Sequence, residues 1–198
     1  MAAGFVNMAL DQSRDQDGMP AFASDIRKLV GEGSSLPPVE SWHPEVQGEI
    51  DIRIAKGGVW FYRGEEMIRT DVVKLLSSIL RKDDEDFFLV TPTEKMKIQV
   101  DDLPFVVSIM DVEGEGQEQK LHFSTQFGDC FTLSESHPLR ATYNERNEPA
   151  PFVNVRCGLD ARISRGVYYE MAELLVEGEG SKTENQFGVW SDGVFYSF

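Results

Sequence analysis

Hydrophobic and polar residues alternate over residues 50–55, where every second position is an isoleucine. This period of two predicts a strand that is buried on one face. Gly57 and Gly58 follow, and paired glycines favour the tight turn of a hairpin. The apolar run over residues 59–62 is therefore predicted to be the second strand of that hairpin.

A helical period follows. Apolar residues recur at helical spacing from Val72 to Leu80, with a narrow polar stripe between them. Thr70 is expected to cap this helix, and Asp71 suits the positive charge of its first turn. Residues 82–86 then form a charged turn, and the next hairpin is predicted to have strands at residues 87–90 and 96–100.

The middle of the chain reads as β structure. Three further strands are predicted over residues 104–110, 120–127 and 130–134, separated by an acidic glycine loop and a Gly128-Asp129 turn. Residues 139–151 are expected to be a long polar connection.

The order of parts then recurs. Strand, glycine turn, strand, Arg-Gly, helix and strand occur once over residues 52–90 and again over residues 153–190. This predicts a duplicated strand-strand-helix-strand motif and an α+β fold with mostly antiparallel sheets. The seam between two such copies is a natural place for a ligand.

Composition narrows the class of protein. The chain has 198 residues, 41% hydrophobic, and a net charge of −15, so we expect neither nucleic acid nor a membrane surface as a partner. Its two cysteines, Cys130 and Cys157, form no metal or redox pair and are expected to be small buried residues in strands. A cytoplasmic location fits best, since there is also no secretory signal. Residues 1–36 are predicted to be a tail with one short helix at residues 25–30.

The sequence contains no strong catalytic or metal-binding motif. No phosphate loop, dinucleotide fingerprint or hydrolase nucleophile motif is present, and none of the three histidines has a ligand partner at helical spacing. We therefore predict no catalytic residue, no metal site and no cofactor, although a catalytic thiol whose base is distant in sequence stays open.

Cationic side chains are the stronger signal. Lys74 and Arg81 lie seven residues apart, on one face of the predicted helix, and Arg63, Arg69 and Lys95 flank it. In so acidic a chain, a cluster of these residues would form a local site for phosphate or carboxylate. The alternative is that they pair with nearby acids. These acids are Asp71, Glu65, Glu66 and Glu94.

Asp101 and Asp102 stand next to each other before Leu103-Pro104-Phe105. The pair is suited to capping a turn, to binding an arginine or to holding a metal. Adjacent residues in extended chain point in opposite directions, so the two do not form a catalytic dyad by themselves.

Several motifs together resemble the bacterial domain-of-unknown-function family 1285. They are Trp42-x-Pro44, Gly48 to Ile54, Gly58-x-Trp60-x-Tyr62-x-Gly64, Ile68-Arg69, Leu80-Arg81, Thr91-Pro92-x-Glu94-Lys95, Asp102-x-Pro104-Phe105, Asn154-Val155-Arg156-x-Gly158-Leu159 and Gly188-Val189-Trp190-Ser191-x-Gly193. The resemblance implies two small domains, residues 37–103 and 104–198, the second similar to a pleckstrin-homology-like barrel. It also implies a ligand pocket at the domain interface, a nucleotide-like ligand and a role in signal transduction.

Transferring the motif positions to that interface gives the predicted ligand-binding residues. They are Arg69, Arg81, Thr91, Glu94, Lys95 and Asp102 from the first half and Arg156 from the second. The leading hypothesis is a regulatory module that binds a small anionic, nucleotide-like ligand. The alternatives are a metal-dependent enzyme acting on a phosphorylated metabolite and a scaffold that binds a protein partner.

Overall fold

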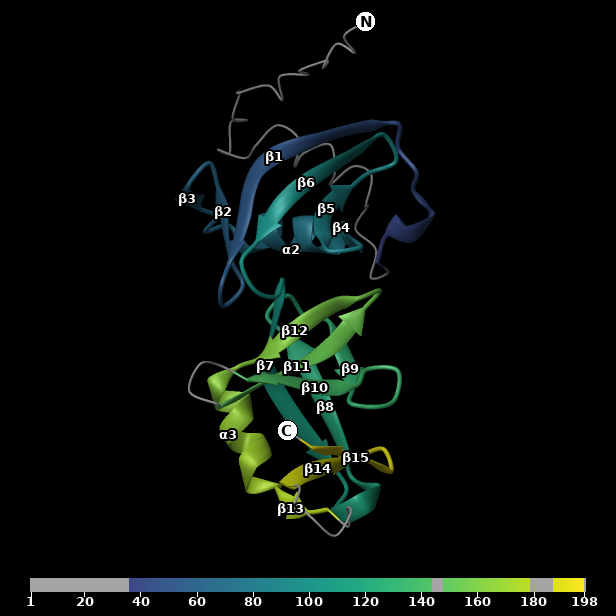
Figure 1. Ribbon diagram of the computed structural model, residues 1–198, viewed down its shortest axis with the longest axis vertical. Helices are drawn as coiled ribbons and strands as arrows, with labels where there is room; N and C mark the ends of the chain where they lie inside the picture. Colours follow the sequence, from purple (N-terminus) through teal and green to yellow (C-terminus); the bar gives the residue numbers. More distant parts are fainter. Residues whose placement is uncertain (1–35, 144–147, 179–186, 198) are drawn as a thin grey trace, which may run out of the picture.

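The computed structural model describes residues 36–143, 148–178 and 187–197. These residues form two lobes, one above the other in Figure 1, and each lobe contains a six-stranded sheet. The tail and short helix predicted for residues 1–36 fall almost entirely outside the described residues. Among the helices described, none is long and apolar enough to span a membrane.

The amino-terminal lobe, residues 36–103, has the strand order β3-β2-β1-β6-β5-β4. Its elements are η1 (Val39–Ser41), β1 (Val46–Ala55), β2 (Val59–Tyr62), β3 (Glu65–Glu66), α2 (Thr70–Ser78), β4 (Leu80–Asp83), β5 (Asp86–Val90) and β6 (Glu94–Val100). Strands β1 and β6 pair in parallel, and the other neighbours pair antiparallel. Both predicted hairpins of this half are confirmed.

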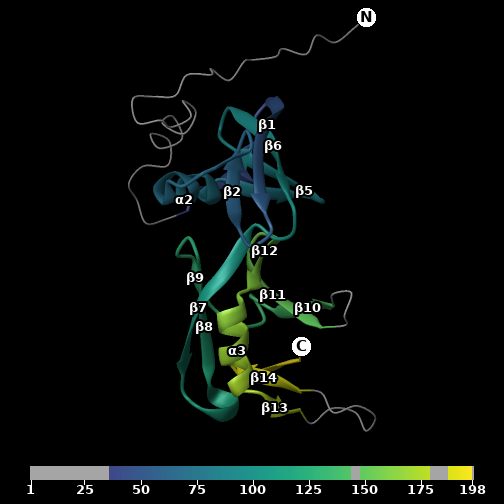
Figure 2. The same cartoon turned by 90° about the vertical axis from the view of Figure 1, so that its left-hand side faces the viewer.

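The carboxyl-terminal lobe, residues 104–197, has the strand order β10-β11-β12-β7-β8-β9. Its elements are β7 (Phe105–Glu113), η2 (Gly116–Glu118), β8 (Lys120–Thr125), β9 (Cys130–Thr132), β10 (Leu139–Tyr143), β11 (Pro149–Arg156), β12 (Leu159–Ile163), α3 (Arg165–Glu173), β13 (Val176–Glu177), β14 (Phe187–Ser191) and β15 (Val194–Ser197). The last three strands make a separate three-stranded sheet. Figure 2 shows α3 running beside β7 towards that small sheet.

The two large sheets share one topology. In each, the first and last of six strands pair in parallel at the centre, and the others extend outward as two antiparallel meanders. The predicted motif is present in both halves, but the strands that follow the two helices belong to different kinds of sheet. The strand after α2 joins the large sheet of its own lobe, whereas the strands after α3 form the separate small sheet. The two repeated units of the sheets are therefore β1–β6 and β7–β12. These bounds differ from the predicted copies at residues 52–90 and 153–190.

Two predicted elements are wrong. The helix ends at Ser78 instead of Leu80, and Leu80–Asp83 forms strand β4, which pairs with β5. The first two residues of the charged turn predicted at residues 82–86 therefore belong to this strand. Lys74 and Arg81 therefore do not share a helix face. In addition, residues 139–151 are not a polar connection, because β10 and β11 pair there as a hairpin. Arg69 is the residue that precedes the first turn of α2, and no side chain caps it, contrary to the role expected of Thr70.

One hydrophobic cluster runs through both lobes. Helix α2 buries Val72, Val73 and Leu76, and the cluster continues through the contact between the lobes into the carboxyl-terminal sheet. Along β8, Leu121 and Phe123 face this cluster, as their alternation with polar residues predicts. The fold is thus α+β with two lobes that share a continuous apolar interior.

Candidate functional site

Arg81 and Lys95 form one structural cluster within the amino-terminal lobe. The buried Arg81 guanidinium donates from Nη1 to the backbone oxygens of Val39 (3.0 Å) and Trp42 (2.8 Å) and from Nη2 to Asp83 Oδ2 (2.9 Å). Lys95 Nζ lies 2.6 Å from the same Asp83 oxygen. Both cations therefore pair with the same carboxylate, and Arg81 links the η1 segment to strand β4.

The Asp83 carboxyl carries the electrostatic signature of this cluster. Burial disfavours its charge, but the hydrogen bonds and positive charges of Arg81 and Lys95 outweigh burial and hold the pKa of Asp83 below its ordinary value. An acid held ionised between two cations fits a structural role.

Three other predicted residues, Arg69, Thr91 and Glu94, make local contacts within the amino-terminal lobe. Arg69 pairs with Asp71 at 3.1 Å on the exposed start of α2, which is one of the acid pairings foreseen from the sequence. Thr91 Oγ1 accepts a hydrogen bond from the Glu94 amide at 3.0 Å and so closes the turn between β5 and β6. None of these contacts joins the two lobes.

Asp101 and Asp102 lie in the segment that links the lobes, and arginines hold them from opposite sides. Asp101 is 3.4 Å from Arg53 of β1, in the amino-terminal lobe. Both oxygens of Asp102 accept from Arg162 of β12, from Nε at 3.1 Å and from Nη2 at 2.6 Å. Among the roles left open for this pair, the structure supports arginine binding, in the opposite directions that extended chain predicts.

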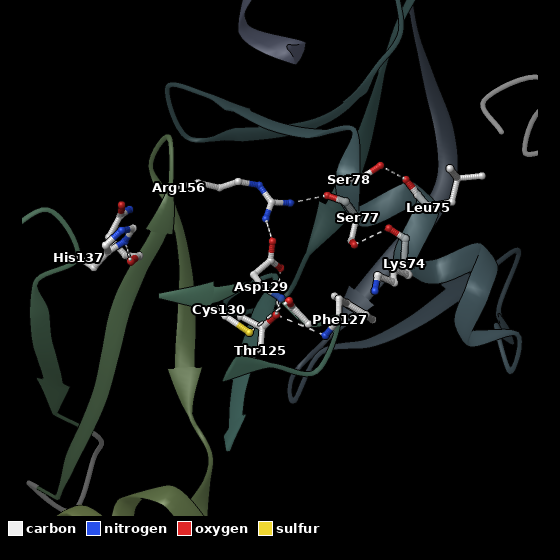
Figure 3. A network of polar contacts seen from close by, with 12 residues as sticks. Lys74, Leu75, Ser77, Ser78, Thr125, Phe127, Asp129, Cys130, His137 and Arg156 are labelled. Atoms are coloured by element: carbon white, nitrogen blue, oxygen red, sulfur yellow. Dashed lines mark hydrogen bonds and ion pairs between the residues drawn. The ribbon is translucent and has the colours of Figure 1, made fainter. Parts of the chain in front are cut away.

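Arg156 of the carboxyl-terminal lobe is a predicted residue that also reaches α2 of the amino-terminal lobe. Its Nη1 donates to Asp129 Oδ1 in its own lobe, and its Nη2 donates at 2.8 Å to the Ser77 carbonyl in the last turn of α2 (Figure 3). The guanidinium also lies 4.9 Å from the centre of the Phe105 ring. A cation at the carboxyl end of a helix is favoured by the helix dipole.

Lys74 approaches the same place from the other lobe. A methyl group built on Gly128 would lie 3.5 Å from Lys74 Nζ, so this ammonium group faces the Gly128-Asp129 turn. Within the described part of the chain, no carboxylate lies within 4.0 Å of Lys74 Nζ. Lys74 and Arg156 thus meet consecutive residues of one turn, and we call this region the interlobe seam (Lys74, Ser77, Gly128, Asp129 and Arg156).

Aromatic rings close the apolar side of the interlobe seam. Phe127 packs edge-on against Trp60 of the amino-terminal lobe (6.4 Å between ring centres) and against Phe105 (6.1 Å). Beside them, Gly58 lies so close to Gln126 that a Cβ atom would be 2.6 Å from Gln126 Nε2. Trp60 belongs to the core, so it offers no exposed surface for stacking a base.

Two buried donors of these side chains have no acceptor. Trp60 Nε1 and Gln126 Nε2 make no hydrogen bond to any described residue. Buried N–H groups are nearly always paired, by protein or by a bound molecule. Of the two, Gln126 Nε2 lies at the contact between the lobes, beside Gly58.

The cysteines differ from their prediction. Cys130 and Cys157 are exposed, and Cys157 lies in the turn after β11 with a φ of 44°. Partial burial raises the pKa of the Cys157 thiol, and the Glu40 carboxylate of the other lobe raises it further by charge and by a hydrogen bond. A thiol with a raised pKa is a poorer nucleophile at neutral pH. Across the described residues, no group of three or more His, Cys, Asp or Glu side chains is placed to hold a metal ion.

Sequence reasoning included Arg156 among the ligand-binding residues, named Lys74 only within a possible cationic cluster, and did not assign Asp129 to a site. A signal was present, because the Gly128-Asp129 turn was predicted and Lys74 was recognised as a candidate cation. What was missing was the contact between them, which depends on how the lobes meet.

Comparison with known proteins identifies the family. Residues 37–103 match the family model described as "Domain of unknown function (DUF1285), N-terminal domain", and residues 104–198 match "Protein of unknown function (DUF1285), C-terminal domain". The chain belongs to the DUF1285 family. The predicted family resemblance is confirmed.

Two crystal structures of DUF1285 proteins are similar to this chain. The protein from Silicibacter pomeroyi is 41% identical, with a TM-score of 0.80 over 87% of this chain and 91% of that one. The protein from Shewanella baltica is 24% identical, with a TM-score of 0.50 over 62% of this chain and 90% of that one, and this likeness concerns the fold alone. No curated protein matches the chain.

Proposed function

We propose that this DUF1285 protein binds a small anionic, nucleotide-like ligand at the interlobe seam, between Lys74 and Arg156. The observation that carries the proposal is the placement of Lys74. In a chain with a net charge of −15, an ammonium group without a carboxylate partner among the described residues faces the turn that Arg156 also contacts. Two cations from different lobes suit a phosphate or carboxylate group.

A buried donor at the contact between the lobes favours a ligand that also carries neutral acceptors. Gln126 Nε2 lies beside Gly58 of the amino-terminal lobe and has no acceptor among the described residues. A carbonyl, hydroxyl or ring-nitrogen acceptor, such as those of a nucleotide, would satisfy it. The nucleotide-like character of the ligand is part of the proposal on this ground.

A regulatory role belongs to the same proposal. A ligand held by Lys74 and Arg156 would take binding energy from both lobes, so its binding would favour one arrangement of them. The likeness of the carboxyl-terminal lobe to pleckstrin-homology folds and a cytoplasmic location stay predictions. The metal-dependent alternative fits less well, because both oxygens of Asp102, the acid on which it depended, are bonded to Arg162.

A thermal-shift screen tests the proposal. Phosphate, pyrophosphate, nucleotides and cyclic nucleotides are added to the full chain, since a ligand that binds only the folded form raises the melting temperature. At a ligand concentration of one hundred times Kd we expect a rise of about 5 °C or more. The shift should disappear in Lys74→Gln and in Arg156→Gln.

Lys97→Gln is the matched control, because Lys97 pairs with Asp86 at 2.8 Å on the amino-terminal sheet and the variant makes the same change in net charge. Its shift should equal that of the wild type. A shift that survives in both seam variants, or no shift with any phosphorylated compound, contradicts the proposal.

A further inference from the structure

Asp129 occupies the place where an anionic ligand would meet Arg156. Its Oδ1 atom accepts from Arg156 Nη1, so the carboxylate already supplies the negative charge that this guanidinium requires. Both side chains are mostly buried, with 17% of Arg156 and 16% of Asp129 exposed. Bulk solvent therefore screens the pair only partly.

The position of the Asp129 carboxylate is fixed by its own turn. Thr125 Oγ1 donates to Asp129 Oδ2 at 2.9 Å and accepts from the Asp129 amide at 3.1 Å. The Thr125 amide donates to the Asp129 carbonyl at 2.9 Å and closes the turn. The carboxylate is thus held at the interlobe seam by contacts that do not depend on Arg156.

Arg156 is likewise held from the side away from Asp129. The Ser77 carbonyl and the face of the Phe105 ring keep the guanidinium in place. An arriving anion would meet a guanidinium that is already oriented but already neutralised. Lys74 of α2 faces Gly128, the neighbouring residue of that turn, and has no such counter-ion among the described residues.

We infer that Asp129 is an internal competitor for the anion site: its carboxylate takes the place of the ligand on Arg156 and lowers the affinity of the interlobe seam for anions. The inference rests on the proposed function, since it concerns the same site. It assigns Asp129 the role of setting affinity, so that the site responds to high ligand concentrations only. A ligand anion must either displace the Asp129 carboxylate or bind beside a like charge.

The test is the affinity of the full chain for pyrophosphate, measured by titration calorimetry at constant ionic strength. Asp129→Asn removes the charge and keeps an oxygen that can accept from Thr125. It should bind pyrophosphate about fivefold or more tightly than the wild type, because a like charge at close range weakens binding by at least that factor even with water-like screening. Asp129→Glu keeps the charge and should bind close to the wild-type value.

Asp86→Asn is the matched control, because it makes the same change in net charge at an ion pair with Lys97 in the amino-terminal lobe. It should leave the affinity unchanged. Circular dichroism and melting curves establish that each variant is folded, and if Asp129→Asn is not folded, Asp129→Ser provides the same neutral substitution with an oxygen for Thr125.

The outcomes separate the two proposals. Tighter binding by the neutral variant, lost again when Arg156→Gln is added, supports the competitor role. Wild-type binding that depends on Arg156 but does not rise in the neutral variant overturns the competitor role and leaves the proposed function standing. If neither the wild type nor the neutral variant binds pyrophosphate, both proposals fail for this anion.

Discussion

At the scale of single residues, Arg81 shows that a cation predicted to bind a ligand can instead have a structural role. Its side chain is only 8% exposed and spans from β4 to the backbone of the η1 segment. Removing one partner of a buried charged pair costs more than the pair contributes, because the other charge is left without compensation. Asp83 is that partner, and its ionisation therefore controls the stability of this corner of the lobe.

We predict that Asp83→Asn destabilises the protein at neutral pH and that its deficit relative to the wild type shrinks in acid. The folded-state pKa of Asp83 is lowered, so its contribution is complete above the ordinary value of 3.8 and is lost as pH falls below that value towards the folded-state pKa. Urea unfolding at pH 7, 5, 4 and 3 measures the deficit. Asp86→Asn, at a more exposed ion pair, is the control. A deficit that stays constant down to pH 3 would contradict the assignment.

At the scale of elements, the turn of the β1–β2 hairpin has two consecutive glycines with different structural roles. Both have positive φ, 90° at Gly57 and 79° at Gly58, so an alanine is strained at either position. Only Gly58 contacts the other lobe, where an added Cβ would be 2.6 Å from Gln126 Nε2 and 3.2 Å from Val106 Cγ2. The tip of this hairpin therefore sets how closely the lobes approach.

We predict that Gly58→Ala costs more stability than Gly57→Ala. Each should lose about 1 kcal/mol from the strained backbone. Gly58→Ala should lose about 1 kcal/mol or more in addition, because the contact with the carboxyl-terminal lobe must shift. Chemical denaturation of both variants gives the difference. Equal losses would mean that Gln126 moves aside freely and that the hairpin tip does not position the lobes.

Local patterns predicted most strands and both hairpins of the amino-terminal lobe, because alternation and glycine turns are local signals. They failed where pairing between distant segments decides the structure. Ile79 and Leu80 continue the helical period of α2, yet Leu80 pairs with Leu89 of β5, and this pairing ends the helix at Ser78. The hairpin of β10 and β11 was missed because prolines and charged residues obscure its alternation.

The candidate site was predictable only in part for the same reason. Arg156 was found through a motif that surrounds it in the sequence. Lys74 and the Gly128-Asp129 turn are far apart in the sequence and come together only because the two lobes meet there. No local sequence pattern in either segment predicts that contact between the lobes.

At the scale of the whole molecule, the lobes behave as halves of one structure. A single apolar cluster crosses the interlobe contact, and the linking segment is held from both sides, by Arg53 at Asp101 and by Arg162 at Asp102. Such a segment does not serve as a free hinge. A single cooperative unfolding transition is the expected consequence, because neither lobe can open without exposing the shared cluster.

The two acids of this linker make the last prediction. Asp102 binds Arg162 through both oxygens with 24% of its side chain exposed, whereas Asp101 makes one 3.4 Å contact with 39% exposed. Asp102→Ala should therefore lose about 1–3 kcal/mol of stability. Asp101→Ala should lose less than about 1 kcal/mol, as exposed ion pairs do. Calorimetry of both variants measures the loss and the number of transitions together. Two separate transitions in Asp102→Ala, with one in the wild type, would show that this arginine contact couples the lobes, while two transitions in the wild type would refute the view that the lobes unfold as one.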